Sequence, residues 1–359
     1  MARYVVLGKG PVGSALARHL AGRGDDVVVV SRSGAPTVAS DDDRAAAPGR
    51  VRHVATDASD ADALTRAVLD AAAGSPRRSM TGAATGSATG SATGSATGSG
   101  SDVAAIINAA NPRYDRWPEL WPALNEAAMD AAERTGAVLV TAANLYGYGA
   151  GSGAMTEQTP LRPTERKGEV RAQMWHDALA RHEAGRIRAT EVRASDYVGP
   201  GATGPAHAGA SLFGPLLAGK ALHPVGDAHQ PHAWTYLPDY VAALAAAADQ
   251  ESAWGRPWIA PTNGAISYAE LVALFAQEAE VPVPPIKPVP AGALKVIGLL
   301  KPPVREVVRV LYQFDEPFVV DSRASENALG VAATPWDVVA RATTAWWQGH
   351  LAAPQHVAR

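Results

Sequence analysis

The most unusual reactive side chains of this sequence are two cations spaced four residues apart. Lys167, Arg171 and Trp175 recur at intervals of four, so a helix would place all three side chains on one face. If that face points into a binding site, Arg171 could hold a ribose or a phosphate by a bidentate contact, and Lys167 could act as a general acid. The alternative is a solvated helix face, because lysine and arginine commonly extend over a surface into water.

Hydroxyl groups that could exchange a proton occur shortly before these cations. Tyr146 and Tyr148 are candidate acids at the end of an apolar run, and Thr141 is a candidate hydroxyl within it. Tyr146 could instead serve a structural turn, since tyrosine often packs its ring without reacting. No metal site is predicted, because the chain has no cysteine and its histidines lack the spacing of metal ligands.

A glycine-rich turn near the N-terminus could bind phosphate through its backbone alone. Gly8 would permit a tight turn, Gly10 would let a diphosphate approach the peptide N–H groups, and Gly13 would let the following helix pack closely on the preceding strand. Pro11 suits the first helical position, and the helix N-terminus adds partial positive charge. The alternative is a purely structural strand–helix turn. The residues expected to contact a dinucleotide here are Gly8, Gly10, Pro11, Val12 and Gly13.

The end of the next apolar run indicates which dinucleotide is preferred. Residues 27–30 are all valine, as expected for a parallel strand covered on both faces. They are followed by Ser31, Arg32 and Ser33, at the position where a carboxylate would bind the ribose 2′-hydroxyl of NAD(H). A guanidinium beside two hydroxyls suits a 2′-phosphate, so NADP(H) is favoured over NAD(H). Arg32 could also be an ordinary solvated loop residue.

Two further turns complete the predicted dinucleotide site. Asp57 follows a third apolar run and could contact the adenine edge, or it could help to cap the next helix. Ala109, Ala110 and Asn111 follow the run at residues 103–108, and small side chains there would let a ribose lie against the backbone. Because the carboxyl ends of parallel strands share one edge of a sheet, these turns are expected to meet the glycine-rich turn.

The alternation of apolar runs with helical patterns predicts an α/β fold, a doubly wound parallel sheet of the Rossmann type. Further strands are expected at residues 137–141 and 189–193. Residues 74–101 repeat threonine, glycine, serine and alanine, and we expect them to form a flexible insertion without a functional role. Residues 294–311 form an amphipathic segment interrupted by two prolines, which could cover the site or form a dimer face.

Composition excludes several classes of protein. The chain has 359 residues, enough for one large α/β domain and a smaller lobe. Its formal net charge of −3 gives no electrostatic reason to expect nucleic acid or an anionic membrane as a partner. No apolar run is long enough to cross a bilayer, and the absence of cysteine rules out disulfides and thiol nucleophiles. A cytoplasmic protein with a small-molecule substrate, possibly a homodimer, is expected.

Together these motifs resemble the extended short-chain dehydrogenases/reductases of the NAD-dependent epimerase/dehydratase family. The resemblance implies a Rossmann domain in residues 1–195, completed by residues 233–262. It also implies a smaller C-terminal substrate lobe in residues 196–232 and 263–350, with the site between the two. The matching segments occur in the family's order at residues 8–13, 108–110, 140–147, 156–161, 193–201 and 234–240.

The sequence departs from this family at its catalytic positions. Such enzymes usually carry serine or threonine where this chain has Ala142, and a Tyr-x-x-x-Lys motif where this chain has Lys167 and Arg171. In the family the tyrosine phenol exchanges a proton with a substrate hydroxyl, and this chain has no phenol at that position.

Three functions are therefore considered. The first is an NADP(H)-dependent oxidoreductase that acts on a small, apolar carbonyl or alkene with non-standard acid/base residues. The second is a dinucleotide-binding sensor or scaffold without catalysis, of the NmrA type. A sugar epimerase or dehydratase is less favoured, because those enzymes also use the missing tyrosine.

Overall fold

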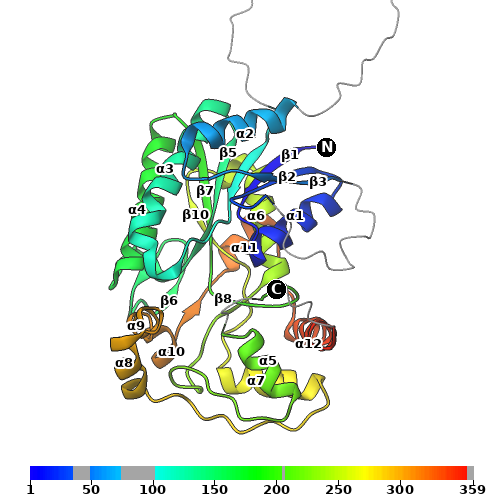
Figure 1. Cartoon of the computed structure of the whole chain (residues 1–359), viewed down its shortest axis with the longest axis vertical. Helices are drawn as coiled ribbons and strands as arrows, with labels where there is room; N and C mark the ends of the chain where they lie inside the picture. The colour runs from blue at the N-terminus through cyan, green and yellow to red at the C-terminus, as the bar shows by residue number, and fades with distance from the viewer. Residues whose placement is uncertain (35–48, 74–101, 204–206, 354–359) are drawn as a thin grey trace, which may run out of the picture.

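The computed structural model describes residues 1–34, 49–73, 102–203 and 207–353 of the chain. The insertion predicted at residues 74–101 lies outside the described residues. Figure 1 shows a central sheet flanked by helices, with a second group of helices below the sheet in this view.

The central sheet has seven strands, and each neighbouring pair is parallel. The strand order is β10-β7-β5-β4-β1-β2-β3, so the winding direction reverses between β1 and β4. Open α/β sheets bind ligands at such a reversal, beyond the carboxyl ends of the strands. The predicted doubly wound Rossmann-type fold is confirmed. The strands are β1 Arg3–Leu7, β2 Asp26–Ser31, β3 Val51–Ala55, β4 Ala105–Asn108, β5 Val138–Asn144, β7 Arg188–Ala194 and β10 Pro257–Ile259.

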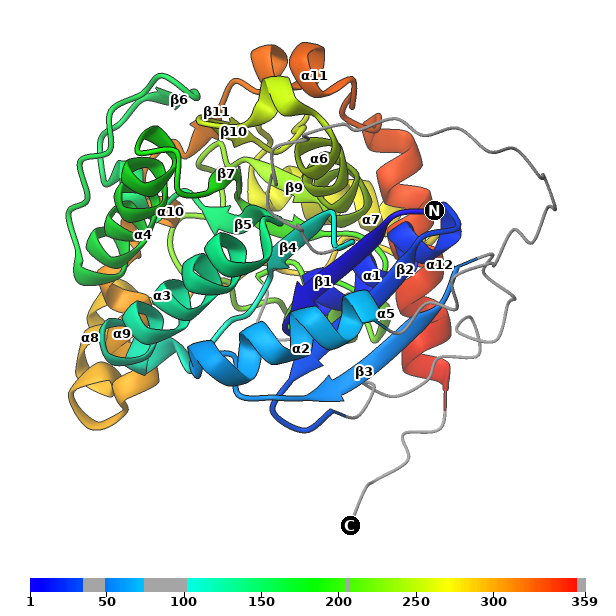
Figure 2. The same cartoon turned by 90° about the horizontal axis from the view of Figure 1, so that it is seen from above.

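Helices cover both faces of the sheet (Figure 2). Val27 and Val29 of β2 belong to the core on one face, and Val28 and Val30 belong to the core on the other. This explains why the strand is a continuous valine run: both sets of alternating side chains leave water. One face is covered by α1 Pro11–Gly22 and α6 Leu237–Asp249, and the other by α2 Ala61–Ala73, α3 Trp117–Thr135 and α4 Arg166–Glu183.

Strand β5 extends three residues beyond its predicted end at Thr141. Ala142 and Ala143 continue the parallel pairing with Val192 and Arg193 of β7. Alanine is a weak strand former, so propensity ends the strand too early, whereas the neighbouring strand supplies the pairing that extends it. Thr141 therefore lies inside the sheet and not at its edge.

A separate hydrophobic core lies among the helices below the sheet. Phe213 stacks on Trp347 in this core, with ring centroids 5.2 Å apart. The division of the chain into a Rossmann domain and a substrate lobe remains a prediction. In that division this core would belong to the substrate lobe. The elements here are α5 Ala210–Leu217, α7 Tyr268–Glu278 and α12 Trp336–Ala352, with the short strand pair β8 Asp196–Val198 and β9 Trp234–Tyr236. A second short pair, β6 Ala154–Met155 with β11 Val319–Val320, belongs to a separate small core.

The amphipathic segment forms two helices, α8 Ala291–Leu300 and α9 Pro302–Arg309. The two prolines begin α9, where the backbone N–H groups have no helical partner in any case. Helix α9 packs against the 3₁₀ helix η2 Tyr114–Arg116, and α8 packs against α9 (Figure 2). The remaining short elements are η3 Tyr146–Tyr148, η4 Glu251–Ala253, α10 Tyr312–Asp315 and α11 Arg323–Leu329.

Within the described residues, no helix has both the length and the apolar character needed to span a bilayer.

Candidate functional site

The turn between β1 and α1 is packed so tightly that a side chain at either of two of its glycines would force the backbone to move. Gly8 has φ +97°, and a Cβ there would lie 2.7 Å from the carbonyl oxygen of Ala109. A Cβ on Gly13 would lie 2.1 Å from the carbonyl oxygen of Gly8, whereas a Cβ on Gly10 would meet no atom within 4 Å. Gly8 and Gly13 thus bring strand and helix together, and Gly10 leaves the outer side of the turn open.

The N-terminus of α1 faces this turn with its first amides uncapped by any side chain that the structure describes. Gly10 is the N-cap residue, and Pro11 begins the helix, as the sequence predicts. The Ser14 hydroxyl donates to the carbonyl oxygen of Lys9 over 3.0 Å, which restrains the turn from inside. The uncapped amides and the helix dipole favour a bound anion here.

The residues predicted to read the adenosine end lie at the carboxyl ends of β2 and β3. Ser31 ends β2 and is partly buried, and Arg32 and Ser33 are exposed. The Asp57 carboxylate accepts hydrogen bonds from the Ser59 amide at 3.0 Å and the Ser59 hydroxyl at 2.7 Å. These bonds, with a smaller contribution from the positive charge of Arg32, lower the pKa of Asp57.

Asp57 does not cap α2. The carboxylate of Asp60 accepts a hydrogen bond from the Ala63 amide over 2.9 Å, and this contact lies in the first turn of the helix. Asp57 closes the turn before the helix through Ser59, and Asp60 supplies the carboxylate at the first helical turn.

The turn after β4 lies directly against the glycine-rich turn. Ala109 is nearly buried, Ala110 is half-buried and Asn111 is exposed. Asn108 at the end of β4 is fully buried, and its side-chain oxygen accepts a hydrogen bond from the Ala110 amide over 3.3 Å. The Asn108 side-chain nitrogen has no hydrogen-bond partner among the described residues. The sequence interpretation included Ala109, Ala110 and Asn111 but not Asn108.

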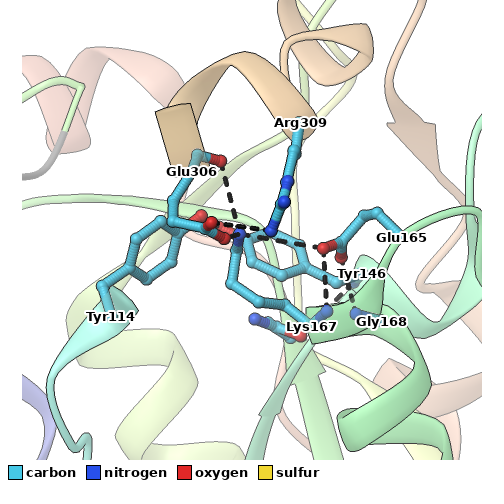
Figure 3. A network of polar contacts seen from close by, with 8 residues as sticks. Tyr114, Tyr146, Glu165, Lys167, Gly168, Glu306 and Arg309 are labelled. Atoms are coloured by element: carbon cyan, nitrogen blue, oxygen red, sulfur yellow. Dashed lines mark hydrogen bonds and ion pairs between the residues drawn. The ribbon is translucent and has the colours of Figure 1, made fainter. Parts of the chain in front are cut away.

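Lys167 is buried in an ionic network and is not part of a solvated helix face (Figure 3). Its side chain is 1% exposed, and its Nζ lies 2.7 Å from a carboxylate oxygen of Glu306 on α9. A second carboxylate, Glu165, lies 3.7 Å from the same Nζ, and the Tyr114 ring centroid lies 4.6 Å from it. Glu165 also caps α4 by accepting from the amides of Lys167 and Gly168. The two carboxylates neutralise the ammonium group of Lys167.

Arg171 is buried by a different means, between two indole rings of α3. Its guanidinium carbon lies 4.7 Å from the ring centroid of Trp117 and 4.2 Å from that of Trp121. Burial lowers the pKa of Arg171, although an arginine keeps its charge in proteins. Its Nε and Nη1 atoms are buried and have no hydrogen-bond partner in the part of the chain that the structure describes. Arg171 therefore keeps unused donors near the side chains of Tyr146 and Tyr197.

The three predicted hydroxyl groups are placed very differently. The Tyr146 hydroxyl lies 3.1 Å from that of Tyr114, and burial raises the pKa of Tyr146, with a further contribution from the charge of Asp196. The Tyr148 hydroxyl donates to the carbonyl oxygen of Thr156 and accepts from Arg193, so it serves packing. Thr141 is buried in the interior of β5, and the structure does not bring it to Tyr146 at the sheet edge.

A buried histidine–carboxylate pair was not predicted from the sequence. The Nε2 atom of His232 lies 2.9 Å from a carboxylate oxygen of Asp196, and its Nδ1 lies 3.0 Å from the carbonyl oxygen of Gln313. A carbonyl oxygen can only accept, so Nδ1 donates to Gln313. The contact between Nε2 and Asp196 then also requires a proton, held by the imidazole or by the carboxyl group. The pair therefore holds one proton between Asp196 and His232.

The surroundings of this pair favour a charged carboxylate. Burial acts to raise the pKa of Asp196, but the hydrogen bond and charge of His232 outweigh it, so the pKa of Asp196 is lowered. His207 stacks on Phe314 with centroids 4.4 Å apart, and burial lowers its pKa to about 4. The described residues contain no cluster of three or more metal-ligating side chains. No periodic pattern in the sequence marks His232 as a partner of Asp196.

These elements define a Rossmann-type protein with a glycine-rich turn at the reversal of its sheet and a polar, aromatic-lined site beside β5 and β7. Residues 123–258 match the model of the NAD dependent epimerase/dehydratase family. The resemblance inferred from the motifs is thereby confirmed. No curated protein matches the sequence significantly.

Solved structures of the same fold cover nearly the whole chain. The dTDP-glucose 4,6-dehydratase of Bacillus anthracis, in complex with NAD, has 14% sequence identity and a TM-score of 0.71, over 97% of each chain. The UDP-glucose 4-epimerase of Bifidobacterium longum, in complex with NAD+ and UDP, has 15% identity and a TM-score of 0.69, over 98% of this chain and 99% of that chain. The UDP-glucose 4-epimerase of Thermotoga maritima, with UDP-glucose, has 14% identity and a TM-score of 0.70, over 97% of this chain and 99% of that chain. Likeness at this level of identity shows the shared fold.

Proposed function

We propose that this protein binds a nicotinamide dinucleotide and acts as an oxidoreductase on a small, largely apolar carbonyl or alkene in the cytoplasm. The observation that supports this most is the turn between β1 and α1, where Gly8 and Gly13 leave no room for a side chain. Such close packing presents the uncapped amides of α1 to a diphosphate. The dehydratase of Bacillus anthracis and the epimerase of Bifidobacterium longum were both solved with a bound dinucleotide, which supports the same kind of ligand here.

NADP(H) is the preferred form in this proposal. Arg32 is exposed at the carboxyl end of β2, between Ser31 and Ser33, and would pair with a 2′-phosphate. Asp57 is close enough to Arg32 for the two charges to interact, and it would help to orient the guanidinium. Asn111 and the backbone of Ala109 would lie along the ribose, as the sequence predicts.

Arg171 would hold the nicotinamide half. Its unused Nε and Nη1 donors belong to a guanidinium that is held against the rings of Trp117 and Trp121. A planar guanidinium held in this way can donate two hydrogen bonds to ribose hydroxyls or a phosphate with little further loss of side-chain entropy.

The proton source is the point at which this chain must differ from its family. A bound dinucleotide supplies hydride chemistry, so the protein has to hold a proton for the oxygen of a carbonyl substrate. We propose that the Asp196–His232 pair holds it. The proton of their contact would pass to the substrate through the Asp196 carboxyl group, whose side chain is 26% exposed, and leave Asp196 charged and His232 neutral. Tyr146 is the second candidate: its raised pKa keeps the phenol protonated, and Tyr114 fixes its hydroxyl.

We assign Lys167 a positioning role in this scheme. The ammonium group of Lys167 donates to the carbonyl oxygen and the carboxylate of Glu306 and lies 3.7 Å from Glu165, so acceptors within the protein already engage it. The network instead fixes α9 over the start of α4 and keeps the Tyr114 ring in place (Figure 3).

A nucleotide-sugar substrate is the second candidate function. It is favoured by the names of the solved relatives, which are sugar-nucleotide epimerases and a dehydratase. The absence of the family's tyrosine at the position of Lys167 counts against it.

Titration calorimetry followed by a turnover screen tests these proposals. We expect NADPH to bind more tightly than NADH, and NADPH to be oxidised in the presence of a member of a panel of small carbonyls. Asp196→Asn should lower kcat while the affinity for NADPH is retained, and UDP-glucose and dTDP-glucose should leave the rate unchanged. NADPH binding without oxidation across the panel would favour the non-catalytic sensor, and absence of binding would refute the proposal entirely.

A further inference from the structure

Helix α8 carries an apolar surface that no other described residue covers. Its side chains are largely in water: Val296 is 63% exposed, Ile297 41%, Leu299 79% and Leu300 85%. We call these four residues the α8 patch. Leu294 on the same helix is only 7% exposed, so α8 is anchored to the protein by its other side. A folded protein rarely leaves adjacent leucines this exposed unless they meet a partner.

The segment around the α8 patch is strongly basic. Residues 281–310 contain five lysines and arginines but one carboxylate, Glu306, although the whole chain has a formal net charge of −3. Glu306 is buried and paired with Lys167 and Arg309, so it offsets Arg309 but neither Lys301 nor Arg305. Lys301 and Arg305, which follow the patch, are exposed. The whole-chain charge, which gives no reason to expect an anionic partner, conceals this local excess.

We propose that the α8 patch and the cations beside it dock on an anionic lipid bilayer, with α8 lying in the plane of the interface. A helix of ten residues is about 15 Å long, which is half of a bilayer core, so α8 can lie on a membrane but not cross it. Apolar side chains flanked by lysine and arginine are the composition of interfacial helices. Figure 2 places α8 outside α9 at the periphery of the molecule, where a flat surface can reach it.

A second copy of the chain fits this surface less well. In a two-fold contact each patch would face its own copy, so Lys301 and Arg305 would lie near their symmetry mates. Like charges facing one another oppose association, whereas anionic headgroups neutralise them. The charge pattern therefore selects the bilayer over the dimer.

Docking through α8 leaves the candidate site free. Helix α9 lies between α8 and the rest of the protein and directs Glu306 towards Lys167. The outer surface of α8 can therefore contact lipid while the inner side of α9 stays against Lys167. The proposal does not depend on the proposed function.

Co-sedimentation with vesicles tests the proposal directly. The full chain should bind phosphatidylcholine vesicles that contain phosphatidylserine, bind pure phosphatidylcholine vesicles weakly, and be released by salt. The double variant Leu299→Asp/Leu300→Asp should lose at least tenfold in partitioning. The matched control Leu69→Asp/Leu351→Asp changes leucines that are 45% and 37% exposed elsewhere on the protein and should bind like the wild type.

Further measurements separate lipid binding from misfolding and from dimerisation. Lys301→Glu should weaken binding by about fivefold or more, since each cation near an anionic surface contributes about that factor. Thermal unfolding and NADPH affinity of the variants show whether they remain folded. Equal vesicle binding by the wild type and the Leu299→Asp/Leu300→Asp variant would overturn the proposal. So would a wild-type dimer in light scattering that this variant dissociates, without any binding to vesicles, because the patch would then join two copies.

Discussion

Replacing Gly13 by alanine should separate α1 from β1 and weaken dinucleotide binding. The added Cβ would lie 2.1 Å from the carbonyl oxygen of Gly8, whereas carbon–oxygen contacts are ordinarily about 3.3–3.6 Å. The helix must therefore move by roughly 1 Å, and overpacking of this kind costs about 1–3 kcal/mol of unfolding free energy. If one charge-assisted hydrogen bond to the diphosphate is lost as well, the Kd for NADPH should rise by about 10- to 100-fold.

Gly22→Ala is the matched control, because Gly22 ends the same helix. A Cβ there would meet no atom within 4 Å, so this variant should keep its NADPH affinity and gain up to about 1 kcal/mol from helix propensity. Denaturant unfolding measures the change in stability, and titration calorimetry measures the affinity for NADPH. The reasoning is refuted if Gly13→Ala and Gly22→Ala have the same stability and the same affinity for NADPH.

Three other results are expected. Arg32→Ala should weaken NADPH binding by about 1.5–3 kcal/mol in calorimetry and leave NADH binding nearly unchanged, and equal losses for both would show that Arg32 does not contact the 2′-phosphate. Lys167→Met should lower the free energy of unfolding by about 3–5 kcal/mol in denaturant unfolding, because it leaves the buried charge of Glu306 without its partner. Adding Glu306→Leu should recover part of that loss. If the losses of the two single variants simply add in the double variant, the two side chains are not directly paired. Burial lowers the pKa of His207 to about 4. Below about pH 6.5 the unfolded chain therefore binds a proton at this histidine, whereas the folded chain does not bind it until the pH is near 4. The free energy of unfolding consequently falls as the pH is lowered from about 6.5 to 4. Unfolding curves of His207→Phe should lack up to about 3 kcal/mol of this loss, the exposed His223→Phe should behave like the wild type, and an unchanged acid sensitivity in His207→Phe would contradict the assignment.

The sequence by itself determined the half of the fold that carries the glycine-rich turn. The valines at residues 27–30 are buried on both faces, and Gly8 and Gly13 stand where a side chain cannot fit. These features depend on residues that are near in sequence or on a strand repeat, so local geometry fixes them. The break at the two prolines between α8 and α9 was predictable for the same reason.

The end of β5 shows where local propensity fails. Ala142 and Ala143 have little preference for a strand, but β7 pairs with them and extends β5 past Thr141. Thr141 was therefore predicted as the last residue of this strand and lies in its interior. The partner strand, and not the sequence of β5, decides where the strand ends.

Only the tertiary structure decided what surrounds the reactive groups. The helical spacing of Lys167 and Arg171 was evident from the sequence, but it did not distinguish a solvated face from a buried one. Lys167 is neutralised by Glu306, which lies 139 residues further along the chain. His232 meets Asp196 across 36 residues and Gln313 across 81, from a loop without any periodic pattern. Spacing within one element follows from the backbone, whereas partners from separate elements are set by how those elements pack, and that packing is a property of the whole chain.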